Sequence, residues 1–330
     1  MIRDGMDAAA IAEAARVIRA GGLVGFATET VYGLGADASS DAAVAGIFAA
    51  KGRPSDHPLI VHVATPAQVG DYAVDMPAFA TRLMTALWPG PLTVILPRRP
   101  GVAAAAAGGQ DSIGLRCPSH PVAQALLAAC TTGVAAPSAN RFGRVSPTTA
   151  QHVADEFGDS LLVLDGGPCE VGIESSIVDC TRGSPVLLRP GVFTRAQLDA
   201  ACGETVLTED EFAGLAAGAD APRASGTLES HYAPDAKVRL MDAAAIQAAL
   251  DLLGADAAHI AVYARSIVRI QSDKVIYRRM PDDALATAQQ LFAVLRSFDD
   301  HAVKLIWIEA PPPAPEWDGV RDRLGRAAAG

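Results

Sequence analysis

Lysine is scarce in this chain of 330 residues: Lys51 is the only lysine before residue 237, and arginine fills the other cationic positions. A compact ammonium kept against that background suggests a task that a guanidinium performs less well. Gly52 and Arg53 follow it directly, and a glycine-punctuated run precedes it. Two cations beside flexible backbone amides suit a phosphate-rich ligand. The alternative is that Lys51 ends a helix, which Ser39 or Ser40 begins and Gly52 caps.

Several kinds of site have no signature in the chain. The five cysteines form no CxxC pair and are odd in number, which argues against a complete disulfide framework. The seven histidines show no HExxH or similar spacing, so we expect no resident metal, and any metal ion would arrive with a substrate. The motifs GxxxxGK[ST] and GxSxG are also absent, which excludes P-loop enzymes and the usual hydrolase elbow.

Basic runs and long apolar runs are missing as well. The formal net charge is −10, and no segment concentrates lysine and arginine as a dedicated nucleic-acid binder does. No segment resembles a secretory signal or a membrane-spanning helix. We therefore expect a cytoplasmic protein with no membrane partner and with weak or no direct binding to RNA.

The alternation of helical and extended patterns predicts a mixed α/β protein of roughly two domains. We expect a first domain over 1–205, a linker over 206–236 that is rich in Gly, Ala, Pro and acidic residues, and a small α/β domain over 237–330. Predicted helices of the first domain cover 7–20, 40–50, 77–87, 121–129 and 148–157. Its predicted strands cover 23–27, 59–63, 93–96, 113–116, 161–164, 176–178 and 186–188. In the second domain we expect strands at 237–241, 259–264, 274–278 and 302–309, helices at 243–253 and 282–298, and a final helix.

Four polar clusters interrupt the apolar segments of the first domain. They are Lys51 with Arg53; Ser112, Arg116 and His120; Pro137, Ser138, Ala139 and Asn140 with Gly143 and Ser146; and 172–176 with Arg189. Arginine can grip a carboxylate through its bidentate fork, and small polar side chains can meet phosphate or ribose oxygens. Taken singly, the clusters are also compatible with a helix end, a salt bridge, an ordinary turn and a strand connection, respectively. His62 is compatible with a packed core histidine, and Glu29 with a base, a metal ligand or a turn residue.

In order along the chain, these clusters fall in the segments TETVYGLG, KGRPSDHPL, WPGPLT, LRCPSHP, PSANRFG, GIESS and LRPG. The series resembles the motifs of the threonylcarbamoyl-AMP synthase family, whose characteristic unit is the YrdC-like domain, over about residues 21–191. The later SHYAP at 230–234, followed by another α/β unit, resembles the long two-domain form. The resemblance implies a mixed twisted-sheet YrdC-like domain followed by a smaller Rossmann-like α/β domain.

The resemblance also implies an activity. Members of this family are nucleotidyltransferases that make L-threonylcarbamoyladenylate and pyrophosphate from L-threonine, bicarbonate or CO2, and ATP, with Mg²⁺ carried by the nucleotide. A separate transferase then uses the product to modify a tRNA adenosine. A protein that hands on an activated small molecule need not hold tRNA strongly, in keeping with the acidic composition.

Carried over motif by motif, the resemblance names Lys51 and Arg53 as the catalytic cations. The implied ATP contacts are Lys51, Arg53, His57, Ser112, Ser138, Asn140, Ser146, Arg189 and Tyr232. The implied threonine contacts are Thr30, His62, Arg116, Ala136 and Ser175. His231 and Tyr232 are further expected to lie over the nucleotide site as a lid that excludes water.

The chain departs from the family pattern at four positions. Ala27 stands where proline is usual, His57 replaces asparagine, Phe142 replaces serine, and Ser176 replaces threonine. The change at His57 has the largest chemical consequence, because an imidazole alters both donor geometry and response to pH. Two other functions are open: a non-catalytic RNA-binding module, and a carbamoyl-adenylate former of hydrogenase maturation, which would carry zinc-finger cysteine pairs that this chain lacks.

Overall fold

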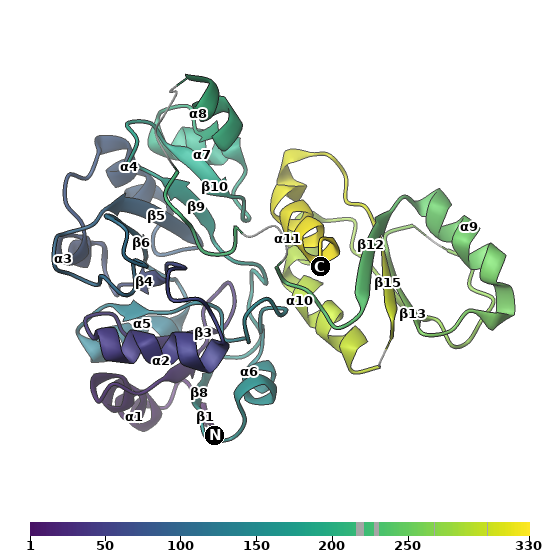
Figure 1. Ribbon diagram of the computed structural model, residues 1–330, viewed down its shortest axis with the longest axis horizontal. Coiled ribbons are helices and arrows are strands. Elements are labelled where there is room, and N and C mark those ends of the chain that lie inside the picture. The colour runs from purple at the N-terminus through teal and green to yellow at the C-terminus, as the bar shows by residue number, and fades with distance from the viewer. Residues whose placement is uncertain (216–220, 228–230, 267, 302) are drawn as a thin grey trace. The chain divides into compact units, whose positions relative to one another are not determined.

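The chain forms two compact units in the computed structural model, which describes residues 1–215, 221–227, 231–266, 268–301 and 303–330 (Figure 1). The first unit comprises Met1–Phe142 and Ser146–Thr227, and the second comprises Gly143–Val145 and Leu228–Gly330. Within the described ranges, no helix is both long and apolar enough to cross a membrane.

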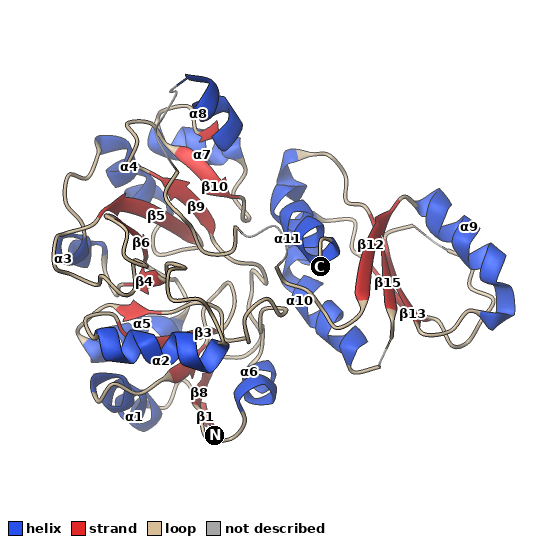
Figure 2. Ribbon diagram, in the orientation of Figure 1, coloured by secondary structure: helices blue, strands red, loops and turns tan. Residues whose placement is uncertain are grey.

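A mixed sheet, whose strands are red in Figure 2, forms the centre of the first unit. Its eleven strands follow the order β1-β8-β2-β3-β7-β4-β6-β5-β9-β10-β11. Its strands are β1 (Ile2–Asp4), β2 (Val24–Phe26), β3 (Gly33–Asp37), β4 (Ile60–His62), β5 (Leu92–Pro97), β6 (Ser112–Arg116), β7 (Val134–Ala135), β8 (Leu162–Asp165), β9 (Ser176–Asp179), β10 (Val186–Arg189) and β11 (Leu207–Thr208). Half of the neighbouring pairs are parallel and half are antiparallel. The predicted mixed α/β sheet is therefore confirmed.

The helices of this unit begin and end at side chains that local sequence supplies. They are α1 (Ala8–Arg19), α2 (Asp41–Lys51), α3 (Val69–Tyr72), α4 (Ala78–Leu87), α5 (Pro121–Cys130), α6 (Ala150–Phe157), α7 (Arg195–Cys202) and α8 (Glu209–Leu215). The Asp7 carboxylate accepts a hydrogen bond from the first turn of α1, and Ser40, rather than Ser39, caps α2. Gly52 ends α2 in the left-handed conformation, with φ of 65°, which glycine adopts without a steric cost.

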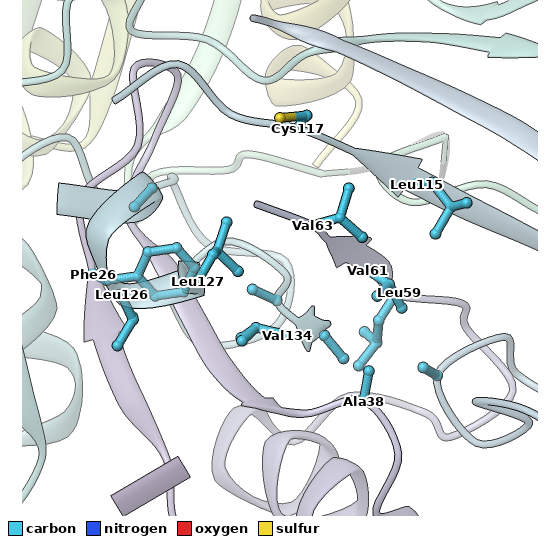
Figure 3. Close-up of a cluster of buried hydrophobic side chains, with 14 of the residues drawn as sticks. Phe26, Ala38, Leu59, Val61, Val63, Leu115, Cys117, Leu126, Leu127 and Val134 are labelled. Atoms are coloured by element: carbon cyan, nitrogen blue, oxygen red, sulfur yellow. The ribbon is translucent and has the colours of Figure 1, made fainter. Parts of the chain in front are cut away.

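The core of the first unit packs strands against helices. Figure 3 shows Phe26 of β2, Val61 of β4, Leu115 of β6, Val134 of β7 and Leu126 of α5, which belong to one buried cluster. Burying such side chains contributes roughly 1.5–3 kcal/mol each. This apolar layer fixes the central strands, and the polar residues at and just beyond their ends carry the candidate site.

A parallel sheet of four strands, in the order β12-β15-β13-β14, forms the second unit. Its elements are β12 (Lys237–Met241), α9 (Ala243–Leu253), β13 (Ile260–Ala264), β14 (Ile276–Arg279), α10 (Ala284–Asp299), β15 (Leu305–Glu309) and α11 (Asp318–Ala328). Ile246, Ile260, Val262 and Trp307 belong to one buried cluster between a helix and the sheet. The predicted succession of strands and helices is confirmed, with boundaries that differ by up to three residues.

Two sequence interpretations need correction. Gly33 and Gly35, the glycines of the run before Lys51, do not supply flexible backbone amides, because both lie in β3, where a Cβ at Gly35 would come within 2.8 Å of side-chain atoms of Phe26 and Val134. The start of the predicted linker is structured too. Leu207 pairs with Val186 of β10, and α8 follows at once, although its acidic and small residues resemble those of a linker.

Candidate functional site

Lys51 lies at the C-terminal end of α2 and is only 3% exposed. Its Nζ donates a hydrogen bond to the Ser138 carbonyl at 2.6 Å and another to the Asn140 carbonyl. The Phe142 amide donates to the Lys51 carbonyl at 2.9 Å. Lys51 therefore does end a helix, and it also holds the segment 138–142, which lies far from it in the chain.

Burial lowers the pKa of Lys51 well below its usual value, and the neighbouring Arg53 lowers it further. Glu156 and Glu174 act in the opposite direction. An anionic ligand beside Lys51 would favour the ammonium form for the same electrostatic reason. The surroundings of Lys51 thus disfavour an isolated ammonium, and a polyanionic ligand beside it would stabilise the charged form.

Ser225 connects two of the predicted ATP-binding arginines. Arg53 donates from Nη2 to the Ser225 Oγ at 3.3 Å and to the Pro58 carbonyl at 3.1 Å. Arg189 donates from Nη1 to the Ser225 carbonyl at 2.8 Å and from Nε to the Ser175 carbonyl at 3.0 Å. No local signal in the sequence marks Ser225 as a partner of either arginine.

The predicted threonine contacts come from adjacent strands of the sheet and from the loops beside them. His62 of β4 pairs in register with Arg116 of β6. Ala136 donates its amide to the Ile60 carbonyl at 2.9 Å, immediately after β7. Ser175, just before β9, shares a 2.7 Å hydroxyl contact with Thr93 of β5. Because β7, β4, β6, β5 and β9 are successive neighbours, these residues line one band of the sheet.

Thr30 and Glu29 lie in the loop between β2 and β3, and Glu29 reaches the band through Arg116. The Thr30 hydroxyl lies 2.9 Å from that of Thr28, and both residues are buried. Glu29 Oε2 lies 2.9 Å from Arg116 Nη2, and the two side chains are 4% and 5% exposed. The sequence interpretation left the role of Glu29 open, and the structure identifies it as the ionic partner of Arg116.

His62 is buried beside this ion pair. Burial, and after it the Arg116 charge, lower its pKa to about 3, although backbone hydrogen bonds act in the opposite direction. The imidazole is therefore neutral at ordinary pH. As a neutral group it adds no charge to the band that contains Arg116 and Glu29.

Replacing His62 with glutamine is expected to flatten the acid limb of the stability curve. Between pH 6.5 and about 3 the unfolded chain binds a proton at His62 that the folded chain does not, so the free energy of unfolding falls as pH falls. We expect the slope across this window to become shallower by about 1 kcal/mol per pH unit in His62→Gln. Urea unfolding at several pH values measures it, with the exposed His301→Gln as the matched control. An unchanged slope would contradict the assignment.

His57 and Phe142, two of the four departures from the family pattern, lie against each other. Their ring centroids are 5.5 Å apart in an edge-on arrangement, and the Arg53 guanidinium stands 5.7 Å from the Phe142 centroid. Burial and then the Arg53 charge lower the pKa of His57. The His57 and Phe142 side chains thus form one aromatic cluster against Arg53, a predicted ATP contact.

A double-mutant cycle on His57→Asn and Phe142→Ser is expected to show non-additive costs in the free energy of unfolding. Aromatic pairs in such cycles typically couple by about 0.5–1.5 kcal/mol, and the same range is expected here. Chemical denaturation of the wild type, both single variants and the double variant measures the coupling. Strictly additive costs would mean that the two rings pack independently.

The remaining predicted contacts have different surroundings. Ser112 begins β6, at the edge of a small pocket that Pro58 and Ser225 also line. The Ser146 hydroxyl donates to Glu174 Oε1 at 2.5 Å. His120, from the second polar cluster, caps α5 through Nδ1, which accepts from the Val122 amide at 3.2 Å.

Tyr232 belongs to the second unit, where it is 1% exposed. Its ring stacks on Phe292 with centroids 5.4 Å apart, and the Arg323 guanidinium stands 5.4 Å from its centroid. The His231 ring meets it edge-on. The predicted nucleotide contact of Tyr232 and the lid remain predictions, and Ser230 of the same motif lies outside the described residues.

No protein-built metal centre is found in the part of the chain that the structure describes, where no three His, Cys, Asp or Glu side chains group suitably. The five cysteines are buried as free thiols. Cationic side chains and hydrogen-bond donors dominate the site. That inventory suits anionic and zwitterionic ligands.

Comparison with known proteins gives consistent matches over both units. Residues 16–191 match the Sua5, YciO and YrdC family, described as telomere recombination, and residues 193–329 match the C-terminal domain of threonylcarbamoyl-AMP synthase. The chain is 37% identical to threonylcarbamoyl-AMP synthase from Bacillus subtilis (strain 168), covering 97% of this chain and 93% of that protein. It is 36% identical to the enzyme of that name from Pyrococcus abyssi (strain GE5 / Orsay), over 99% and 96%. A structure of P. abyssi Sua5 complexed with L-threonine has a TM-score of 0.87 at 36% identity, covering 96% of this chain and 94% of that one.

Proposed function

The chain belongs to the threonylcarbamoyl-AMP synthase family of ATP-using enzymes, and we propose that it makes L-threonylcarbamoyladenylate and pyrophosphate from L-threonine, bicarbonate or CO2, and ATP. The nucleotide enters as its Mg²⁺ complex. The product serves a tRNA threonylcarbamoyl transferase in the cytoplasm, which modifies an adenosine of tRNA.

One observation carries the proposal: a buried ammonium, two arginines and a line of small polar residues converge in the first unit. Lys51 Nζ lies 2.6 Å from the Ser138 carbonyl, beside Asn140, while Arg53 and Arg189 both bond to Ser225. Three cations in one unit supply the counter-charges that a triphosphate requires. The Bacillus and Pyrococcus relatives, both named threonylcarbamoyl-AMP synthase, support the choice of substrates.

Threonine would bind along the band that contains His62, Arg116 and Ser175. Arg116 offers a guanidinium to the carboxylate, and a neutral His62 beside it adds no competing charge. Ser175 connects the predicted threonine contacts with the predicted ATP contacts, because its carbonyl accepts a hydrogen bond from Arg189. Its hydroxyl contacts that of Thr93. The P. abyssi structure complexed with L-threonine supports an amino-acid site in this fold.

The chemistry asks the protein mainly to position two substrates. The threonine nitrogen, carried as a carbamate, presents an oxygen to the α-phosphorus of ATP, and pyrophosphate leaves. Holding the reactants in that geometry removes much of the barrier. Lys51 and Arg53 offset the negative charge that grows on the departing pyrophosphate. No covalent intermediate on the enzyme is needed.

Pyrophosphate release from ATP, measured with threonine and bicarbonate together and with each omitted, tests the proposal. We expect release only when both are present, together with a product that has the mass of threonylcarbamoyladenylate. Release that ignores threonine would overturn the assignment. Salt-dependent tRNA binding without any turnover would instead indicate the RNA-binding alternative.

A further inference from the structure

The Glu29 and Arg116 side chains form a buried ion pair whose hydrogen-bonding capacity is unfilled. Oε2 of Glu29 lies 2.9 Å from Nη2 of Arg116. Yet neither Glu29 oxygen, and neither Nε nor Nη2 of Arg116, makes a hydrogen bond to any described residue. Buried polar atoms in folded proteins almost always have partners, and buried charges require them most. A carboxylate and a guanidinium left in this state therefore indicate a ligand that supplies both kinds of partner.

The unfilled atoms define the chemistry of that ligand. Nε and Nη2 form one edge of the guanidinium fork, the geometry that holds a carboxylate through two parallel hydrogen bonds. The Glu29 oxygens beside that edge can only accept, so they require a donor, most favourably a cation. A carboxylate and an ammonium on one small molecule are the two ends of an α-amino acid zwitterion.

Charge balance favours the same ligand. The pair is neutral as a whole, and a zwitterion is neutral too, so binding brings no net charge into a buried place. A hydroxy acid would satisfy Arg116 but would give Glu29 no cation. Its hydroxyl is only a neutral donor, and its net negative charge would enter a buried site, so we expect the analogue to bind much more weakly.

We propose that Glu29 recognises the α-ammonium group of the substrate and, with Arg116, selects an amino acid over the corresponding hydroxy acid. This inference rests on the proposed use of threonine. Glu29 thereby positions the nitrogen that must become the carbamate. The role lies outside the threonine contacts that the family motifs imply. It gives the glutamate of TETVYG a chemical task beyond holding Arg116.

Calorimetric titration without ATP tests the proposal on the full chain. L-Threonine is compared with 2,3-dihydroxybutanoate of matching configuration, which replaces only the ammonium with a hydroxyl. We expect the wild type to bind threonine at least about 100-fold more tightly. Equal affinity for the two ligands overturns the proposal, whatever any variant does.

Glu29→Gln keeps the shape of the side chain and removes its charge. We expect it to weaken threonine binding by about 50-fold, to change binding of the hydroxy acid by less than about threefold, and to leave the KM for ATP unchanged. Glu309→Gln is the matched control, since Glu309 is a buried glutamate that pairs with Arg265 at 2.8 Å in the second unit. That control should bind threonine as the wild type does.

Two outcomes separate this inference from the proposed function. If Glu29→Gln weakens both ligands equally, Glu29 acts only by holding Arg116 and the inference is wrong, even when the wild type releases pyrophosphate. If the wild type discriminates between the ligands and the variant does not, Glu29 has the proposed role, even when no pyrophosphate is released and the reaction itself must be reassigned.

Discussion

Lys51→Met is expected to lower kcat/KM for threonine-dependent pyrophosphate release by about 10³-fold, because it removes a preorganised cation from a water-poor site. The effect should fall on ATP turnover while threonine binding is retained. Methionine matches the apolar stem of lysine and lacks only the terminal ammonium, so α2 should keep its packing. Pyrophosphate release under saturating threonine, with threonine titration as a second readout, measures both effects.

The free energy of unfolding shows whether Lys51→Met still folds normally. The ammonium is buried and its pKa is lowered, so its removal eliminates an unfavourable desolvation. It also leaves the Ser138 and Asn140 carbonyls without their donor. These opposing effects predict a small net change in the free energy of unfolding. Lys274→Met, at an exposed lysine of the second unit, is the matched control. Turnover within tenfold of the wild type would exclude Lys51 from the reaction.

Arg116→Met is expected to destabilise the first unit by about 3–5 kcal/mol, because it leaves the Glu29 carboxylate buried without a counter-charge. Adding Glu29→Gln to the same chain should restore most of the loss, since the isolated charge is then gone. Denaturant unfolding of the two single variants and the double variant measures this. Threonine binding should be lost in both variants that lack the arginine.

The Arg265–Glu309 pair of the second unit supplies the comparison for that cycle. The carboxylate left behind there, Glu309, keeps hydrogen bonds from the Ser266 amide and hydroxyl, whereas neither Glu29 oxygen has one. Arg265→Met is therefore expected to cost less than Arg116→Met. Equal costs at the two pairs, or a double variant no more stable than Arg116→Met, would show that the Glu29 charge is not desolvated.

Local sequence patterns predicted most strands and helices of both units, because these depend on neighbours in the chain, whereas the mixed sheet was implied by the family resemblance. Ser40 and Gly52 show this for α2: a hydroxyl at the start and a residue free to adopt positive φ at the end act within one turn. The glycines of β3 were misinterpreted for the same reason. Their neighbours in the chain suggest a flexible backbone, whereas the contact that requires glycine comes from Phe26 and Val134.

What only the tertiary structure decided is which of the singled-out residues meet. Lys51 and Ser138 are 87 positions apart, and no local periodicity states that the ammonium of one reaches the carbonyl of the other. Glu29 stayed undecided in the sequence, because its partner Arg116 lies on β6 and reaches it through the strand order of the sheet. Helix caps and strand patterns are set by energies that act along a few residues, whereas ion pairs and desolvation are set by the packing of distant strands.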